Sequence, residues 1–177
     1  MRATANWLNR VSGGLNQLAL WGAILAVGVM LASAGWQVVA RYILAQPPIW
    51  TEELARFSMV WGGLLGASCA FKNQYDPTLF PEAQNRTDPI GLVLAWVRAA
   101  GVMLFISPIL WYSIFGLNGK ISSGYIGRLA GRQAETMDVP MTVFGIAIPI
   151  AFTIIFIHLL ADLAMRMSGA ASQENPQ

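Results

Sequence analysis

The stretch PPIWTEELARFSMVWGGLLGASCAF, residues 47–71, carries all of its charge at one end. Glu52, Glu53 and Arg56 follow a Pro-Pro pair and a tryptophan, and no charged residue occurs from position 57 to position 71. That run makes only about 22 Å of helix at about 1.5 Å per residue, whereas the hydrocarbon core of a bilayer is about 30 Å thick. The stretch therefore predicts a short transmembrane helix whose charged first turns lie among the lipid headgroups.

The composition of the whole chain is that of a membrane protein. Of its 177 residues, 55% are hydrophobic and 11% are charged, against roughly a quarter charged in soluble domains. Four segments are long enough to cross a bilayer, and they cover about 15–43, 53–71, 89–117 and 139–161. We therefore predict an all-α membrane protein, a single four-helix membrane domain over residues 1–177, with an interfacial helix start before the second span and a disordered tail at 168–177.

The N-terminal segment has some features of a cleavable signal peptide. Arg2 and Arg10 precede an apolar run, but this run continues without charge as far as Ala40, which favours an uncleaved first transmembrane helix. Four spans place both termini on one side of the membrane. The basic residues are divided almost equally between the two sides, so charge bias leaves the side open, although Arg2 and Arg10 favour a cytoplasmic N-terminus.

The acids at the start of the second helix have a structural explanation and a functional one. We expect Thr51 to be the N-cap, the two glutamates to complement the positive end of the helix dipole, and Arg56 to pair with either acid one turn away. Glu52 and Glu53 point about 100° apart on a helix, so they cannot converge on one substrate. Interfacial anchoring and partner contact are favoured over catalysis, and we expect no enzyme activity.

Other functional classes find little support in the sequence. The chain has one cysteine, Cys69, and one histidine, His158, which are too few ligands for a metal site. Its basic residues are scattered and form no patch for nucleic acid. His158 could ligate haem, but it precedes Asp162 by four residues, so a local pair on one helix face is favoured. We expect no cofactor. The segment GRLAGRQAETM, residues 127–137, predicts a short surface helix.

The predicted spans lack the equipment of a solute pathway. No charged residue is expected at mid-membrane, and the two halves of the chain do not resemble each other as the repeats of many transporters do. Small residues along GGLLGASCA, residues 62–70, permit close approach of another helix, either from a partner or from the chain's own bundle. These features indicate an accessory or scaffold subunit.

The residues around the second helix resemble a known family. Arg41-Tyr42 closes the first helix, Trp50 and the acidic motif open the second, and Trp61 and Gly66-Ala67 follow. Together with the proline-bearing segment DVPMTVFGIAIPIAF, residues 138–152, this pattern resembles the small membrane subunit of tripartite ATP-independent periplasmic (TRAP) transporters.

The resemblance implies specific partners and a location. In this family a large permease subunit holds the substrate and sodium sites and moves an elevator-like domain, while a periplasmic substrate-binding protein delivers an organic acid. The small subunit would extend the fixed scaffold in the bacterial inner membrane, in contact with lipid, help dock the binding protein, and keep both termini cytoplasmic.

The candidate partner-interface and helix-anchor residues are Arg41, Trp50, Glu52, Glu53, Arg56, Trp61 and Arg98. Arg98 lies near a helix start, from which its side chain can reach the interface. The alternative function is a haem- or quinone-associated membrane anchor subunit of a respiratory enzyme.

Overall fold

The computed structural model describes residues 2–75 and 89–168, and its long helices confirm the predicted all-α class with four membrane spans. The three unbroken spans are α1 (Arg2–Tyr42), α2 (Trp50–Lys72) and α4 (Pro89–Ile114). The fourth span consists of α6 (Met141–Gly145) and α7 (Ala147–Met167). A short 3₁₀ turn, η1 (Ile121–Ser123), and the helix α5 (Tyr125–Leu129) lie between α4 and α6.

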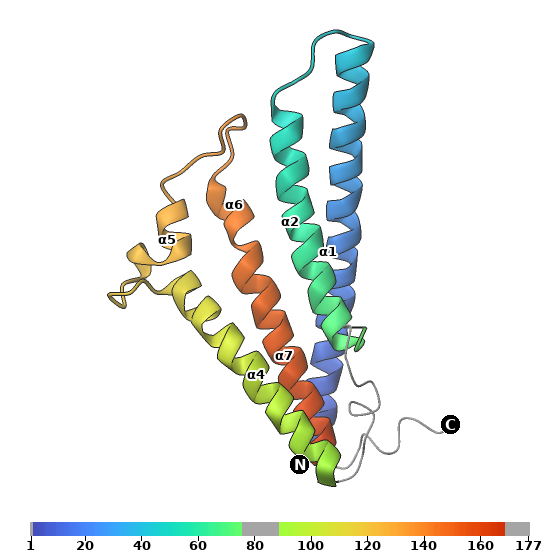
Figure 1. Cartoon of the computed structure of the whole chain (residues 1–177), viewed down its shortest axis with the longest axis vertical. Helices are drawn as coiled ribbons and strands as arrows, with labels where there is room; N and C mark the ends of the chain where they lie inside the picture. The colour runs from blue at the N-terminus through green and yellow to red at the C-terminus, as the bar shows by residue number, and fades with distance from the viewer. Residues whose placement is uncertain (1, 76–88, 169–177) are drawn as a thin grey trace.

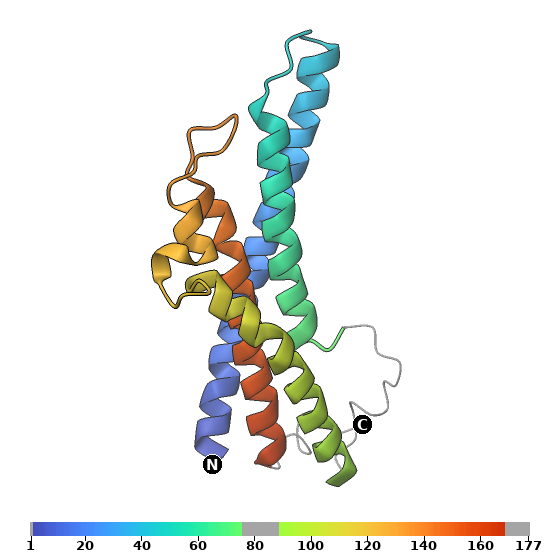
Figure 2. The same ribbon diagram turned by 60° about the vertical axis from the view of Figure 1, so that its left-hand side comes forward.

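The helices spread apart from one end of the molecule (Figures 1 and 2). The antiparallel pair α1 and α2 runs side by side, α7 packs against both of them, and α4 packs mainly against α7. We call the end where α1 begins and α7 finishes the terminal end. The opposite end, with the α1–α2 turn and the α5–α6 region, is the loop end. The predicted tail lies outside the described residues.

Small and medium-sized residues form the contacts between the helices. One cluster joins α1 and α2 through Ala19, Ala23, Leu65 and Cys69, with Trp61 packed against it. A second cluster, containing Ala99, Leu159 and Leu163, joins α4 to α7. Small side chains let helix backbones approach closely in lipid, where burial of apolar area supplies little driving force between helices.

The first span is longer than its apolar run. We expected a helix from about residue 15, but α1 begins at Arg2. Its 41 residues make about 61 Å of helix, twice the thickness of the hydrocarbon core. Hydropathy marks only the part of a helix that lies in lipid, and the polar first turns of α1 have their own contacts, because Asn9 and Ser12 bond to α2 and α7.

The expected fourth helix, 139–161, is divided and displaced. Pro149 has no backbone N–H to donate to the carbonyl of Gly145, four residues earlier, and its ring crowds that carbonyl. The helix accordingly breaks between α6 and α7 at this point and then continues to Met167. The third helix, expected to reach residue 117, ends at Ile114, before a turn in which the Gly119 N–H donates to the Gly116 carbonyl.

The segment between α4 and α6 is closely packed. Gly124 and Gly127 allow this packing, because a Cβ at either position would lie 2.2 or 2.3 Å from a backbone oxygen of Ile114 or Ile121. The surface helix predicted for residues 127–137 is wrong, since α5 ends at Leu129. The chain instead forms a loop, residues 130–140, closed by hydrogen bonds from Ala134 N–H to the Val139 carbonyl and from Met141 N–H to the Arg132 carbonyl. We call residues 130–140 the rim loop.

Candidate functional site

Glu53 joins the start of α2 to the rim loop. Its carboxylate accepts hydrogen bonds from the backbone N–H of Glu135 at 2.9 Å, from the backbone N–H of Thr136 at 2.8 Å, and from the Thr136 hydroxyl. The side chain is largely buried, with 7% of the residue exposed. Charge-assisted hydrogen bonds of this kind are roughly twice as strong as those between neutral groups. One carboxylate thus accepts from two consecutive backbone donors of a loop that lies 82 and 83 positions later in the sequence.

The neighbouring Glu52 does not contact the rim loop. It forms a weak pair with Arg56, 3.7 Å apart, and both side chains are about two-thirds exposed (65% and 67%). Exposed pairs of this kind contribute little to stability. The two neighbouring glutamates therefore separate as the helical angle predicts, one towards solvent or headgroups and one towards the rim loop. Thr51 is not the N-cap, because Ile49 holds that position and the Thr51 hydroxyl donates to the Pro48 carbonyl at 2.8 Å.

An aromatic contact and a cavity lie beside the Glu53 contact. The rings of Phe57 on α2 and Phe144 on α6 stack with centroids 3.8 Å apart and planes 7° from parallel. A cavity of about 410 Å³ lies between the start of α2 and the rim loop, and its wall includes Glu53, Arg56 and Arg132. Polar and aromatic contacts therefore fix the same two elements against each other at the loop end.

The other candidate residues from the sequence do not join this site. Arg41 is exposed in the last turn of α1, Trp50 is exposed at the first residue of α2, and Trp61 packs against the α1–α2 cluster. Arg98 lies at the terminal end, 3.7 Å from Asp162, with its guanidinium 5.3 Å from the centre of the Phe71 ring. Of the seven candidate residues, only Glu52, Glu53 and Arg56 lie together at this site.

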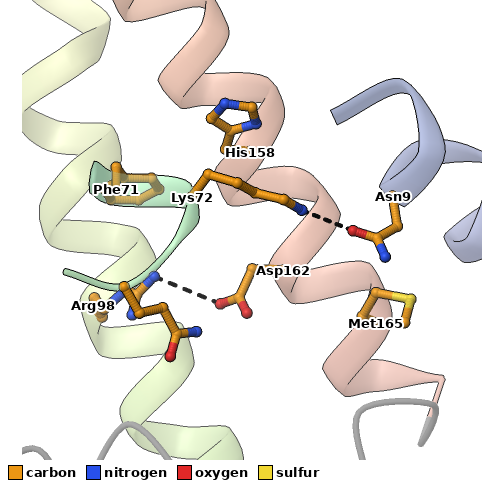
Figure 3. A pocket seen from close by; sticks show the side chains of 8 residues that line it. Asn9, Phe71, Lys72, Arg98, His158, Asp162 and Met165 are labelled. Atoms are coloured by element: carbon orange, nitrogen blue, oxygen red, sulfur yellow. Dashed lines mark hydrogen bonds and ion pairs between the residues drawn. The ribbon is translucent and has the colours of Figure 1, made fainter. Parts of the chain in front are cut away.

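The terminal end contains a polar cluster that the sequence did not indicate as a unit (Figure 3). Asp162 accepts two hydrogen bonds of 3.1 Å from Arg166 and also faces Arg98. Lys72, the last residue of α2, donates to the side-chain oxygen of Asn9 on α1 at 2.7 Å. Residues from all four spans thus meet here.

His158 lies deeper in the same region, and its predicted pairing with Asp162 is wrong. The ring is 1% exposed and its Nδ1 is 2.7 Å from the hydroxyl oxygen of Ser12 on α1. The other ring nitrogen, Nε2, is buried without a hydrogen-bond partner among the described residues. Asp162 pairs instead with Arg166, one turn further along α7, and with Arg98 on α4. The hydroxyl of Ser12 gave no signal in the sequence, because serine is common in membrane helices for packing alone.

The described part of the chain holds no group of three or more His, Cys, Asp or Glu residues placed to bind a metal ion. The arrangement at the loop end is suited to fixing a surface, and the arrangement at the terminal end to holding a polar cavity between helices.

Comparison with known proteins places these features in one family. No curated protein matches the sequence. Residues 30–169 match the family described as tripartite ATP-independent periplasmic transporters, DctQ component. The match covers the C-terminal part of α1 from residue 30 and all of the other spans, including both elements joined by Glu53. The chain therefore belongs to the DctQ family, the small permease component of TRAP transporters.

Proposed function

We propose that this chain is the non-catalytic scaffold subunit of an ion-coupled TRAP transporter for organic acids. It binds the large permease subunit within the inner membrane, and its loop end helps to dock the periplasmic substrate-binding protein. Sodium coupling and the substrate site belong to the large subunit in this proposal. Family membership supports the assignment of the complex, and the joined loop end supports the docking role.

The observation that carries the docking role is the attachment of the rim loop to α2. A docking surface must keep its shape without its partner, since ordering a loop on binding costs affinity. The rim loop meets this condition through Glu53, the Phe57–Phe144 stack and its own backbone hydrogen bonds. It also presents the exposed charges of Arg132, Glu135 and Asp138, which suit a polar and reversible contact.

The contact with the large permease requires an apolar surface inside the membrane. α4 packs mainly against α7 alone, and it leaves large side chains uncovered, such as Leu104 at 81% and Phe105 at 65%. α1 likewise exposes Leu18 and Leu25 at about 70% (71% and 69%). Either lipid or a polytopic partner can cover such surfaces. The large permease therefore binds the exposed face of α4 or that of α1.

The scaffold role is tested by purification and reconstitution. The tagged chain is expressed with its neighbouring genes, purified in mild detergent, and its partners are identified by mass spectrometry. We expect a much larger polytopic protein to co-purify. Liposomes containing the isolated chain should take up no organic acid under a sodium gradient, while those containing both membrane subunits and the binding protein should. Uptake by the isolated chain would refute the scaffold assignment.

The docking role is tested by comparing two adjacent glutamates. Glu53→Ala removes the acceptor for three hydrogen bonds, so we expect binding-protein affinity and uptake to fall severalfold while the permease still co-purifies. Glu52→Ala is the matched control and should behave as wild type. Thr136→Val keeps both backbone donors and should give an intermediate effect. Equal activity of all three variants in a reconstituted uptake assay would exclude a role for the fixed rim loop.

Family membership also favours the scaffold over the alternative of a haem- or quinone-associated anchor. His158, which suggested that alternative, has one ring nitrogen bonded to Ser12.

A further inference from the structure

The turn between α1 and α2 exposes large apolar side chains at the loop end. Five residues of this turn are between 41% and 79% exposed, and we call them the hairpin tip: Tyr42, Ile43, Leu44, Ile49 and Trp50. An aromatic side chain presents about 150–250 Å², so Tyr42 and Trp50 alone expose roughly 200 Å², and the three aliphatic side chains add to this area. Apolar patches of more than a few hundred Å² commonly mark a surface that contacts protein or membrane.

The charged residues of α2 show where the tip lies relative to the bilayer. Glu53 and Lys72 are separated by about 30 Å of helix, at about 1.5 Å per residue. The hydrocarbon core has the same thickness, about 30 Å. α2 therefore crosses the core between these two residues, and Glu53 lies at the core boundary of the loop end.

α1 continues beyond that boundary. Gly62 of α2 faces Val27 of the antiparallel α1, because an added Cβ would lie 3.1 Å from the Val27 side chain. Counting the same number of residues along both helices brings Glu53 level with about residue 36 of α1, so Tyr42 lies about 9 Å further out. The residues that follow Tyr42 lie further still.

Lipid does not reach the outer part of the tip. The headgroup layer adds only about 5–8 Å outside each face of the core, so Tyr42, Ile43 and Leu44 lie beyond it. The described part of the chain does not cover them either, since the α1–α2 turn is its farthest point at the loop end (Figure 1). Apolar side chains at this distance from the core therefore require a protein partner.

The tip keeps its shape without a partner. The N–H of Gln46 donates to the Ala40 carbonyl at 3.1 Å, and Ala45 takes a left-handed backbone conformation with φ 54°, which closes the end of α1. Pro47 and Pro48 then restrict the chain before α2. A preformed surface loses less conformational entropy on binding. The hairpin tip is therefore suited to a tight and lasting contact.

The same side of α1 continues from the tip into the membrane. Val38, Leu31 and Ile24 are each more than half exposed (56%, 62% and 52%). They recur at intervals of seven residues, close to two helical turns, so they lie on one side of the helix. Tyr42 follows Val38 by four residues and belongs to that side. A partner that covers the tip can therefore follow α1 into the bilayer.

The chemistry of the tip distinguishes a permanent partner from a transient one. Obligate interfaces are more hydrophobic than those that form and separate. The rim loop is polar, which suits the binding protein, whereas the tip is apolar and aromatic and would be exposed to water whenever a transient partner left it.

Resting on the proposed function, we infer that the large permease covers the hairpin tip and the strip of α1 formed by Ile24, Leu31 and Val38. It binds the tip through an apolar surface outside the bilayer. The large permease thus lies against α1 rather than against α4.

Photo-crosslinking in membranes tests this contact. The tagged chain is expressed with its neighbouring genes and carries p-benzoylphenylalanine in place of Ile43 or, as the control, in place of Leu117. Leu117 is also apolar and exposed, at 88%, but it follows α4. We expect irradiation to join position 43 to the large permease, with at least a tenfold lower yield from position 117. No adduct with the permease from position 43, or equal yields from the two positions, would overturn the inference.

Substitutions test whether the contact matters for assembly. Ile43→Ser combined with Ile49→Ser should lower the amount of permease that co-purifies in mild detergent at least fivefold, while Leu117→Ser should retain it. Both tip positions are exposed, so circular dichroism should show the same helix content in every variant. Full retention of the permease by the folded double variant would also overturn the inference.

The same experiments separate a wrong contact from a wrong scaffold assignment. If the wild-type chain co-purifies with no large polytopic protein, the scaffold assignment fails and the contact at the tip fails with it. If the permease co-purifies but position 43 gives no adduct with it, only the contact at the tip is wrong.

Discussion

Individual polar residues in this chain act as connectors between helices that are far apart in sequence. Glu53 bonds to Thr136, 83 positions away, and Ser12 bonds to His158, 146 positions away. In lipid a polar side chain without a partner is costly, so such bonds specify which helices pack together. The unequal roles of Glu52 and Glu53 show that two identical neighbours can differ completely once one of them meets a loop.

The Ser12–His158 hydrogen bond should contribute measurably to stability. Ser12 is fully buried (0% exposed), and Ser12→Ala would leave Nδ1 of His158 without its partner. We expect the free energy of unfolding to fall by about 0.6–1.7 kcal/mol, from the average to the largest value measured for interhelical hydrogen bonds in a membrane protein. Thermal unfolding in detergent is the measurement.

Ser113→Ala is the matched control for that substitution. Ser113 is also buried, but its hydroxyl donates to the Ile109 carbonyl of its own helix. Its loss removes no contact between helices and should shift the melting temperature less. An equal shift for both variants would mean that the Ser12–His158 bond has no special role in joining α1 to α7.

At the scale of elements, the α1–α2 pair shows which side of the small-residue segment, residues 62–70, packs within the chain's own bundle. Within GGLLGASCA, Gly62 faces α1, because an added Cβ would lie 3.1 Å from the Val27 side chain, whereas Gly63 has nothing within 4 Å. Ser68 and Cys69 are buried, while Ala67 is exposed. One side of this segment packs within the chain, and the other side is open.

We expect an added side chain to destabilise the chain at Gly62 but not at Gly63. Gly62→Leu should separate α1 from α2 and destabilise the chain by about 1–3 kcal/mol, as overpacking commonly does. Gly63→Leu introduces the same side chain into the same helix but meets no neighbour, so the fold should be retained. Melting temperatures in detergent would distinguish the two, and similar values would contradict the assigned faces.

The sequence predicted the spans better than their ends. Apolar runs such as residues 57–71 located the membrane segments, because solvation by lipid acts on each segment separately. The start of α1 at Arg2 and the break before Pro149 depend on contacts and backbone geometry that composition does not report. The contact of Glu53 with the rim loop could not be predicted, since two of its three donors are backbone N–H groups, which every residue except proline carries, and the third is one threonine hydroxyl among many hydroxyls in the chain.

At the scale of the whole molecule, the terminal end and the loop end carry different groups of polar residues. The terminal end holds the half-buried cluster around Asp162, and the loop end holds the rim loop and the exposed pair of Glu52 and Arg56. The weak charge bias of the sequence does not decide which end faces the cytoplasm. The proposed docking role requires the loop end to face the periplasm.

Cysteine labelling can test that orientation. Cys69 is buried and can be replaced by alanine, after which Asn118→Cys reports on the loop end and Asn6→Cys on the terminal end, since both asparagines are exposed. A membrane-impermeant maleimide, applied to cells with a permeabilised outer membrane, should modify Asn118→Cys. Asn6→Cys should react only after the inner membrane is opened. The reverse result would invert the topology and exclude docking at the rim loop.

The Glu53 contact also has a consequence for biogenesis. Glu53 enters the membrane with the second span, but Glu135 and Thr136, which donate to it, are synthesised only after the third. Until the ribosome has passed that point, the carboxylate has no protein partner and must remain hydrated at the headgroups. The closing of the rim loop on α2 is therefore a late event in insertion, and a chain halted before residue 135 would present an open loop end to the cell's quality control.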